Sequence, residues 1–252
     1  MTSEFAGKAA FITGGATGIG RAAALQLAAL GAKVAIADVA LDKAKMTAAD
    51  CENAGGKAIA IAMNVRNDGQ VAAAVKATVQ AFGALDIAIN AAGVGGPEVR
   101  TAEYAPEDWD AVIDINLSGV WRCLRHEIPI MLAQKSGCIV NVASVAGLNG
   151  FPRHPAYAAS KHGVVGLTKT AALEYGRKGV RINALCPGFT LTPMVQSMLD
   201  AGLAADDLAA RVPLGRLGTP EEVAASALYL CSSAAAFMIG HALTIDGGIV
   251  AG

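Results

Sequence analysis

The sequence predicts an α/β protein with a doubly wound parallel sheet and helices on both faces. Short apolar segments alternate with helical stretches along nearly the whole chain of 252 residues, and such alternation requires parallel strands joined by right-handed crossovers. Most strand segments are apolar throughout, as is typical of strands covered on both faces. Because no linker, repeat or low-complexity tract interrupts the pattern, residues 1–252 are predicted to form one domain.

Each element follows from local composition. Seven segments have the length and residue types of strands: Ala9–Thr13, Val34–Asp38, Ala58–Asn64, Ile87–Ala91, Cys138–Val142, Arg181–Cys186 and Ala242–Ile245. Six segments between them have helical periodicity: Ile19–Leu30, Asp42–Asn53, Gln70–Phe82, Trp109–Leu132, Ala158–Tyr175 and Glu221–Cys231. The stretch Pro187–Gly218 departs from the pattern, and we expect it to leave the sheet.

Composition excludes several classes of protein. The 20 basic and 21 acidic residues give a net charge of −1, which provides no basic surface for nucleic acid or an anionic membrane. Although 54% of the residues are hydrophobic, no run reaches the roughly 18–20 apolar residues of a spanning helix. The first residues lack the pattern of a signal peptide. We therefore expect a cytoplasmic protein with neither nucleic-acid nor membrane partners.

The cysteines and histidines predict neither disulfides nor a metal site. The cysteines are odd in number and at least fifteen residues apart, which fits neither a disulfide framework nor a metal knuckle: Cys51, Cys123, Cys138, Cys186 and Cys231. We expect reduced, buried thiols. The four histidines are scattered and offer no ligand geometry.

A glycine-rich turn follows the first predicted strand. The segment reads TGGATGIG over residues 13–20, and a helix begins at once. Glycines allow a sharp turn and close approach to a pyrophosphate, and the helix N-terminus offers free N–H groups to an anion. The candidate residues for binding it are Gly14, Thr17, Gly18, Ile19 and Gly20. An ordinary glycine-rich turn is the alternative interpretation.

Asp38 ends the second predicted strand, eighteen residues after Gly20. A carboxylate at this position can accept hydrogen bonds from both hydroxyl groups of an adenosine ribose. Because a helical segment follows, Asp38 is also a candidate N-cap. The glycine-rich turn before it favours the ribose interpretation.

Three polar residues in the middle of the chain are candidates for proton chemistry. Tyr157 and Lys161 are four residues apart, so on a helix they share one face. Lowering a tyrosine pKa from about 10 toward 7 takes roughly 4 kcal/mol, which an adjacent buried cation can supply. Ser144 follows the fifth predicted strand, at the edge where α/β sheets bind ligands. A solvated helix face and a simple turn residue are the alternatives.

These motifs together resemble the short-chain dehydrogenase/reductase family, in its subtype of about 250 residues. The matching segments occur in the family's order over nearly the whole chain: TGGATGIG (13–20), Asp38, Asn90-Ala91-Ala92-Gly93, Asn116, Ser144, Tyr157-Ala158-Ala159-Ser160-Lys161, Pro187-Gly188 and Ile245-Asp246-Gly247-Gly248. The resemblance implies an oxidoreductase that uses a nicotinamide dinucleotide and has a seven-stranded Rossmann sheet.

The resemblance also implies catalytic roles. Tyr157 would exchange a proton with the substrate oxygen, while Lys161 would lower the tyrosine pKa and hold the nicotinamide ribose. Ser144 would orient the reacting oxygen. Asn116 would carry a proton relay through a water beside Lys161.

Further positions match cofactor contacts of the family. Asn90 and Gly93 would border the cofactor, with Asn90 also supporting the fourth strand. The remaining matches are Pro187, Gly188, Thr190 and Thr192, for the carboxamide and phosphates. The family often has an aspartate near the adenine, where this chain has Asn64-Val65. Asn64 keeps a donor and an acceptor but loses the charge.

Asp38, with no basic residue beside it, favours NAD over NADP as the cofactor. The leading interpretation is an NAD-dependent alcohol dehydrogenase or carbonyl reductase. One alternative is an NADPH-dependent 3-oxoacyl thioester ketoreductase, and another is a catalytically silent nucleotide-binding protein.

The stretch that leaves the sheet after the sixth predicted strand is expected to form a substrate lid at about residues 190–216. The residues expected to line it are apolar, which favours a mostly apolar secondary alcohol or its ketone: Leu148, Phe151, Phe189, Met194, Met198 and Leu199. The long helical segments carry more apolar residues than one face against the sheet requires, which predicts a symmetric oligomer. The resemblance favours a homotetramer.

Overall fold

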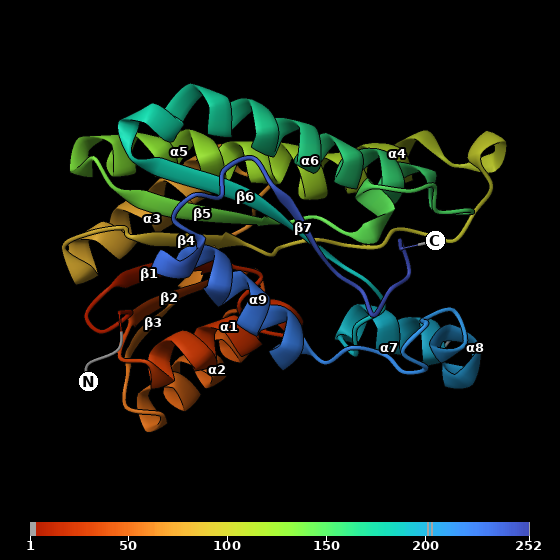
Figure 1. Cartoon of the computed structure of the whole chain (residues 1–252), viewed down its shortest axis with the longest axis horizontal. Helices are drawn as coiled ribbons and strands as arrows, with labels where there is room; N and C mark the ends of the chain where they lie inside the picture. The colour runs from red at the N-terminus through yellow and green to blue at the C-terminus, as the bar shows by residue number, and fades with distance from the viewer. Residues whose placement is uncertain (1–3, 201, 203, 252) are drawn as a thin grey trace.

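The computed structural model describes residues 4–200, 202 and 204–251. Its centre is a seven-stranded parallel sheet in the order β3-β2-β1-β4-β5-β6-β7 (Figure 1). The strands are β1 (Ala9–Thr13), β2 (Lys33–Asp38), β3 (Lys57–Ala62), β4 (Ile87–Asn90), β5 (Gly137–Val142), β6 (Val180–Pro187) and β7 (Ala242–Ile245). The predicted doubly wound fold is confirmed.

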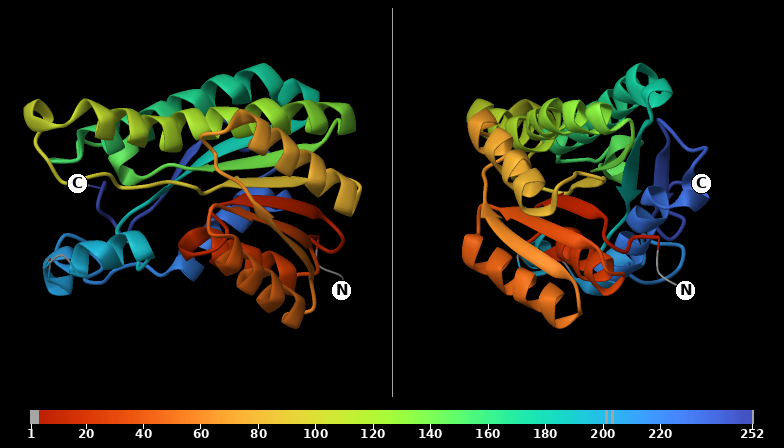
Figure 2. Two further views of the ribbon diagram at one scale, coloured as in Figure 1. Left: turned by 180° about the vertical axis from the view of Figure 1, so that it is seen from behind. Right: turned by 90° about the vertical axis from the view of Figure 1, so that its left-hand side faces the viewer.

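Helices cover both faces of the sheet (Figures 1 and 2). One face carries α1 (Gly18–Ala29), α2 (Leu41–Asn53) and α9 (Pro220–Cys231). The other carries α3 (Asp68–Phe82), α4 (Pro106–Ile113), α5 (Gly119–Gln134) and α6 (Pro155–Tyr175). Each helical layer closes its own hydrophobic core against the sheet, which explains why most strands are apolar on both sides.

Two short helices, α7 (Pro193–Asp200) and α8 (Ala205–Ala209), lie beyond the carboxyl ends of the strands (Figure 1). A backbone bridge between Thr190 and Gly218 closes the base of this excursion. This excursion contains the segment predicted to be a substrate lid, of which positions 201 and 203 lie outside the described residues.

The third strand ends at Ala62, before the predicted Asn64, because a turn begins at Asn64. The side-chain oxygen of Asn64 accepts a hydrogen bond from the backbone N–H of Arg66 at 3.0 Å. Its own N–H donates to Gln70 Oε1 at 2.8 Å. These local bonds replace the bonding to β2, which ends with the Met63 N–H.

The helix predicted over Trp109–Leu132 is interrupted by a π-helical turn at Asp114–Ser118. Asp114 pairs with Arg122 at 2.6 Å and with Arg66 at 2.9 Å, which fixes the wider turn. π-turns are frequent at functional sites, and this one carries Asn116. Periodicity alone cannot reveal it, because the inserted residue leaves the sequence helical on both sides.

A buried polar cluster fastens α5 and α6 to the sheet. The Asn90 amide donates to Glu127 Oε2 at 3.1 Å and to Asn141 Oδ1 at 3.0 Å. Asn141 in turn donates to Thr168 Oγ1 at 2.9 Å. Burial raises the pKa of Glu127 to about 8, against a smaller opposing effect of the Asn90 hydrogen bond. The Glu127 carboxyl is therefore mostly protonated at neutral pH.

No helix in the described part of the chain combines the length and the apolar character that crossing a bilayer requires.

The raised pKa of Glu127 predicts a pH-dependent stability. Its folded-state pKa exceeds the ordinary value of 4.5, so the folded chain binds more protons and the free energy of unfolding falls as pH rises from about 4.5 to 8. A shift of this size corresponds to roughly 5 kcal/mol. We expect Glu127→Gln to remove this contribution, as measured by urea unfolding across that range. Glu52→Gln, at an exposed position of α2, is the control. If Glu127→Gln left the pH dependence of the free energy of unfolding unchanged, Glu127 would not have a raised pKa in the folded state.

Candidate active site

A cleft of about 1000 Å³ opens at the carboxyl ends of the strands. The strand order reverses between β1 and β4, so the connections leave in opposite directions there and separate the loops that follow the two strands. Such switch points are the usual ligand sites of open α/β sheets. The cleft runs from Asp38, at the end of β2, to the residues of α7.

The glycine-rich loop after β1 packs directly against the chain that follows β4. Gly14 has a φ of +64°, and a Cβ placed there would lie 2.8 Å from the backbone of Ala92. The Ala92 N–H donates to Thr13 Oγ1 at 3.2 Å, which holds the two segments together. A Cβ at Gly20 would meet the carbonyl oxygen of Gly14. Only glycine at both positions permits this tight turn into α1.

The same loop leaves the start of α1 open toward the cleft. Thr17 is the N-cap of α1, yet its side chain makes no capping hydrogen bond. Thr17, Gly18 and Ile19 line the cleft with the first turn of the helix. A Cβ at Gly18 would lie 3.3 Å from Thr192 Cγ2, so this loop also contacts the excursion. The free N–H groups and the positive end of α1 form a site for an anion.

Asp38 ties the glycine-rich loop to the start of α2. One carboxylate oxygen accepts from the Ala16 N–H at 3.1 Å, and the other from the Ala40 N–H at 2.9 Å. Asp38 is therefore not the N-cap of α2, which is Ala40. Each oxygen keeps a further lone pair, and the side chain lines the cleft beside the exposed Val39.

Ser144, Tyr157 and Lys161 lie together in the middle of the cleft. Ser144 follows β5, where its hydroxyl accepts from the Ala146 N–H at 3.1 Å. Tyr157 and Lys161 lie one turn apart on α6, and the Lys161 ammonium is 5.6 Å from the centre of the Tyr157 ring. Lys161 Nζ donates to the carbonyl oxygen of Val142 at 2.8 Å. The helix and the strand end thus place one cation and two hydroxyl groups side by side.

Burial governs the pKa values of this group. It lowers the pKa of Lys161 to about 8. It also raises the pKa of Tyr157 above its ordinary value, while a hydrogen bond with Ser144 opposes the rise. The sequence predicted a lowered tyrosine pKa, and here the direction is the reverse because desolvation outweighs the hydrogen bond with Ser144.

Asn116 lies behind the cleft rather than in its wall. Its Oδ1 accepts from the Val94 N–H, and its Nδ2 donates to the Val94 carbonyl, both at 2.9 Å. Nδ2 also donates to Ser160 Oγ at 3.2 Å. A Cβ at Gly93 would lie 3.2 Å from Asn116 Oδ1 and 3.6 Å from Lys161 Nζ. Asn116 therefore fixes the strand-end loop against α6 beside the lysine.

The far end of the cleft, beside Tyr157, is largely apolar. The rings of Phe151 and Tyr157 have centroids 6.2 Å apart, and Phe189 lies 6.3 Å from Phe151. Met194 and Met198 of α7 complete this part of the wall. Leu199 and Leu148 were expected here but pack elsewhere, Leu199 under the excursion and Leu148 in the core beneath α6.

Nearly all predicted site residues line this one cleft. Those not yet placed also contribute to its wall: Asn64, Val65, Pro187, Gly188 and Thr190. Asn90 and Asn116 are the exceptions. Asn90 is buried in the polar cluster with Glu127 and supports β4, as predicted, without reaching the cleft wall.

Two parts of the wall were not among the predicted site residues. His154 lines the cleft beside Phe151, with ring centroids 4.8 Å apart. Its place between Ser144 and Tyr157 in the sequence allowed contact with substrate, but a surface loop was the favoured interpretation. The segment 94–96 also contributes. Its adjacent glycines, Gly95 and Gly96, were the available signal for a closely packed loop.

The chain is similar to known proteins over nearly its whole length. The family model described as "Enoyl-(Acyl carrier protein) reductase" matches residues 14–250. The chain is 42% identical over 247 residues to cyclohexanol dehydrogenase of Acinetobacter sp. (strain SE19), covering 98% of this chain and 96% of that protein. It is 40% identical to a 3-oxoacyl-(acyl-carrier-protein) reductase of Thermotoga maritima, covering 97% and 98%.

The crystal structure of levodione reductase superposes with a TM-score of 0.93 at 38% identity, covering 97% of this chain and 98% of that chain. The chain belongs to the short-chain dehydrogenase/reductase family. Members of this family are oxidoreductases that use nicotinamide cofactors.

The close packing of Gly14 predicts a large effect of a single methyl group. Gly14→Ala would combine a left-handed backbone with a clash against Ala92, so we expect it to lower the free energy of unfolding by about 2–4 kcal/mol. Gly7→Ala is the matched control. Its φ of +77° is similar, but nothing lies within 4 Å of the added methyl group, so its cost is about 1–2 kcal/mol. Equal losses in urea unfolding would show that the packing against Ala92 adds nothing.

Proposed function

We propose that this protein is an NAD(H)-dependent oxidoreductase that interconverts a cyclic, mostly apolar secondary alcohol and its ketone. The observation that carries the proposal is the position of Tyr157. Tyr157 is hydrogen-bonded to Ser144, and Lys161 lies beside its ring. Phe151, Phe189 and α7 form an apolar wall in the same part of the cleft. This arrangement suits proton transfer to or from an alcohol that brings little charge of its own.

The residues at the other end of the cleft fit a nicotinamide dinucleotide. The positive end of α1 and the backbone at Gly14 and Gly18, where a Cβ would be crowded, fit a pyrophosphate. The free lone pairs of Asp38 fit the two hydroxyl groups of an adenosine ribose. Lys161 and Thr192 would hold the nicotinamide half. When bound, NAD accepts or supplies the hydride.

The proton moves through residues of this chain. Ser144 would donate a hydrogen bond to the substrate oxygen and orient it toward Tyr157. Tyr157 would then accept the alcohol proton in oxidation or donate it in reduction. The positive charge of Lys161 would stabilise the tyrosinate.

The apolar wall supports the cyclic character of the substrate. Aromatic rings and methionine side chains present broad, adaptable surfaces without charge. The nearby arginine, Arg153, pairs with Glu98 at 2.8 Å, so it does not offer a free charge to a carboxylate. The name of the cyclohexanol dehydrogenase relative supports an alicyclic alcohol as well.

The chain is almost as similar to a 3-oxoacyl-(acyl-carrier-protein) reductase as to the cyclohexanol dehydrogenase. Reduction of a 3-oxoacyl thioester is therefore the second candidate function. An NADPH-dependent enzyme of this kind would be favoured by a basic residue in the glycine-rich turn or directly after β2. This chain has Ala16-Thr17 and Val39 at these positions, with the acidic Asp38 hydrogen-bonded to the Ala16 N–H. This favours the NAD-dependent alcohol dehydrogenase.

Exposed apolar side chains support a homotetramer in the cytoplasm. Leu173 is 82% exposed, and Phe237 is fully exposed on the loop after α9. Tyr229 and Ile239 are also exposed, and contacts between identical subunits would cover such apolar side chains. The cysteines are free thiols, as in proteins of a reducing compartment.

Tyr157→Phe should abolish turnover while leaving NAD affinity nearly unchanged, because it removes the hydroxyl and keeps the ring. A positioned acid/base contributes about 10²–10⁴ in rate. The measurement is kcat by NADH absorbance, with NAD affinity by fluorescence titration. Tyr175→Phe, at the end of α6, is the control. A Tyr157→Phe variant with more than about a tenth of the wild-type rate would contradict the role.

A preference for NAD(H) over NADP(H) follows from Asp38. A 2′-phosphate beside this carboxylate would be repelled by about 1–4 kcal/mol, which corresponds to roughly tenfold to several hundredfold in kcat/KM. Asp38→Asn should reduce the ratio of kcat/KM with NAD(H) to kcat/KM with NADP(H) by the same factor. Asp42→Asn, at an exposed carboxylate on α2, should leave it unchanged. Equal kcat/KM values for the two cofactors in the wild type would refute the preference.

A further inference from the structure

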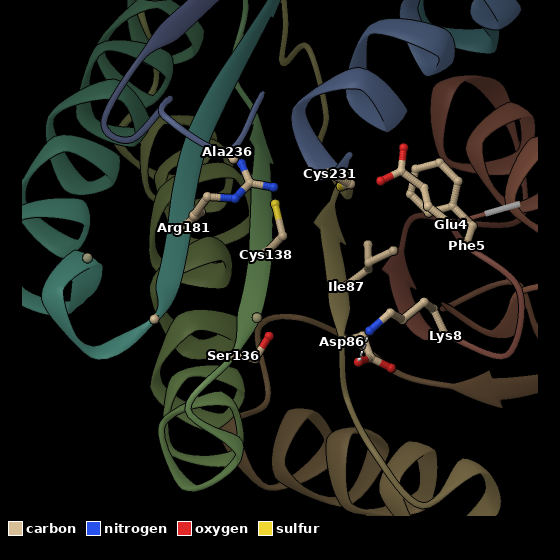
Figure 3. Close-up of a pocket in the computed structure, with 13 residues that line it drawn as sticks. Glu4, Phe5, Lys8, Asp86, Ile87, Ser136, Cys138, Arg181, Cys231 and Ala236 are labelled. Atoms are coloured by element: carbon tan, nitrogen blue, oxygen red, sulfur yellow. Dashed lines mark hydrogen bonds and ion pairs between the residues drawn. The ribbon is translucent and has the colours of Figure 1, made fainter. Parts of the chain in front are cut away.

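A second pocket opens on the opposite edge of the sheet, at the amino ends of β4, β5 and β6. This back pocket has a volume of about 400 Å³ and is lined by Cys138, Cys231, Arg181, Lys8, Asp86 and Glu4, among others (Figure 3). None of these residues belongs to the cleft described above. Two of the five cysteines of the chain therefore lie in one solvent-connected pocket.

The two cysteines line the same pocket although they are far apart in sequence. Cys138 is the second residue of β5, and Cys231 is the last residue of α9. The Cys138 thiol donates a hydrogen bond to the carbonyl oxygen of Leu230, the residue before Cys231, at 3.3 Å. Figure 3 shows both cysteine side chains at this pocket, with Cys138 beside the Arg181 guanidinium group.

A fixed guanidinium group lies beside the pair. Arg181 donates to the carbonyl oxygens of Leu230 at 2.8 Å, Ala235 at 3.1 Å and Ser232 at 3.2 Å. These bonds hold its positive charge next to Cys138, as Figure 3 shows.

The two carboxylates that line the pocket have partners other than Arg181 and the cysteines. Asp86 pairs with Lys8 at 3.1 Å, and Glu4 accepts from the Ser233 N–H at 2.8 Å.

This environment distinguishes Cys138 from the other cysteines. The neighbouring Cys231 thiol and the charge of Arg181 lower the pKa of Cys138 from its usual value of 9.0, although its burial acts in the opposite direction. Burial instead raises the pKa of Cys51 and of Cys186 to about 11, and that of Cys123 well above its usual value. Because the thiolate is the reactive form, we expect Cys138 to react faster than these three cysteines.

We propose that Cys138 and Cys231 are a redox-active thiol pair, which a low-molecular-weight disulfide entering the back pocket oxidises to an intramolecular disulfide. Three features of the structure carry this inference: the two thiols in one pocket, the opening of that pocket to solvent, and the Arg181 cation that shares the Leu230 carbonyl with Cys138. The product would join β5 to the end of α9. The reaction uses no residue of the cleft, so it stands independently of the proposed function.

The chemistry proceeds in two exchange steps. The Cys138 thiolate attacks one sulfur of the reagent disulfide, forms a mixed disulfide and expels the other half as a thiolate. This thiolate takes up the proton that Cys138 released. The Cys231 sulfur, after losing its proton to solvent, then attacks Cys138 Sγ and expels the second half as a thiol. The protein loses two electrons and two protons, and one reagent disulfide becomes two thiols.

Oxidised glutathione is the probe for the test. In the folded wild-type protein we expect a loss of two hydrogen atoms in the intact mass, with the disulfide mapped to Cys138 and Cys231. In Cys231→Ser, which lacks the resolving thiol, one glutathione should remain attached at Cys138. Cys51→Ser is the control and should behave as the wild type. Absence of the disulfide, or a glutathione adduct at another cysteine, would overturn the proposal.

A second measurement needs no variant and so does not depend on how the substitutions fold. Limited alkylation of the native wild-type chain with iodoacetamide at neutral pH, followed by peptide mapping, gives a rate for each cysteine. Cys138 should be modified at least about tenfold faster than Cys51, Cys123 and Cys186, because more of it is thiolate. Similar rates at these four positions would overturn the proposal.

Discussion

The site is organised around a lysine ammonium group taken out of water. Lys161 is 4% exposed, and its burial lowers its pKa from 10.5 to about 8, a cost on the order of 3 kcal/mol at neutral pH. The Val142 carbonyl accepts one of its hydrogen bonds, and its remaining N–H groups are available to ligands in the cleft. Since the folded state binds fewer protons here, this cost disappears as pH rises from about 8 to 10.5.

The surrounding structure keeps that ammonium in place. A Cβ at Gly147 would lie 2.6 Å from the Lys161 carbonyl oxygen, so the turn after β5 packs on α6 without any side chain between them. On the other side, the π-turn presents Asn116 to the Val94 backbone. The reversal of strand order brings these loops to one edge of the sheet. Each of the three therefore contributes to the packing around Lys161.

The sequence predicted what depends on local spacing. The glycines of the first turn, Asp38 after β2, and the Tyr157–Lys161 pair on one helix face could be found because each follows from a single element. The π-turn, the Asn90–Glu127 contact and the packing of Leu199 could not, because each depends on how separate elements meet. The Cys138–Cys231 pair is the same kind of case, since its members are 93 positions apart in sequence (231 − 138). Desolvation also escaped prediction, and it reversed the expected pKa shift of Tyr157.

A steady-state comparison of substrates tests the central claim most directly. Purified protein would be assayed with cyclohexanol and other alicyclic alcohols with NAD⁺, with sugars and charged hydroxy acids with NAD⁺, and with a 3-oxoacyl thioester and NADPH. We predict that an alicyclic alcohol with NAD⁺ gives a kcat/KM at least about tenfold above the other two groups, because the wall beside Tyr157 excludes charge. A higher kcat/KM for the acyl thioester with NADPH would contradict both the substrate class and the cofactor.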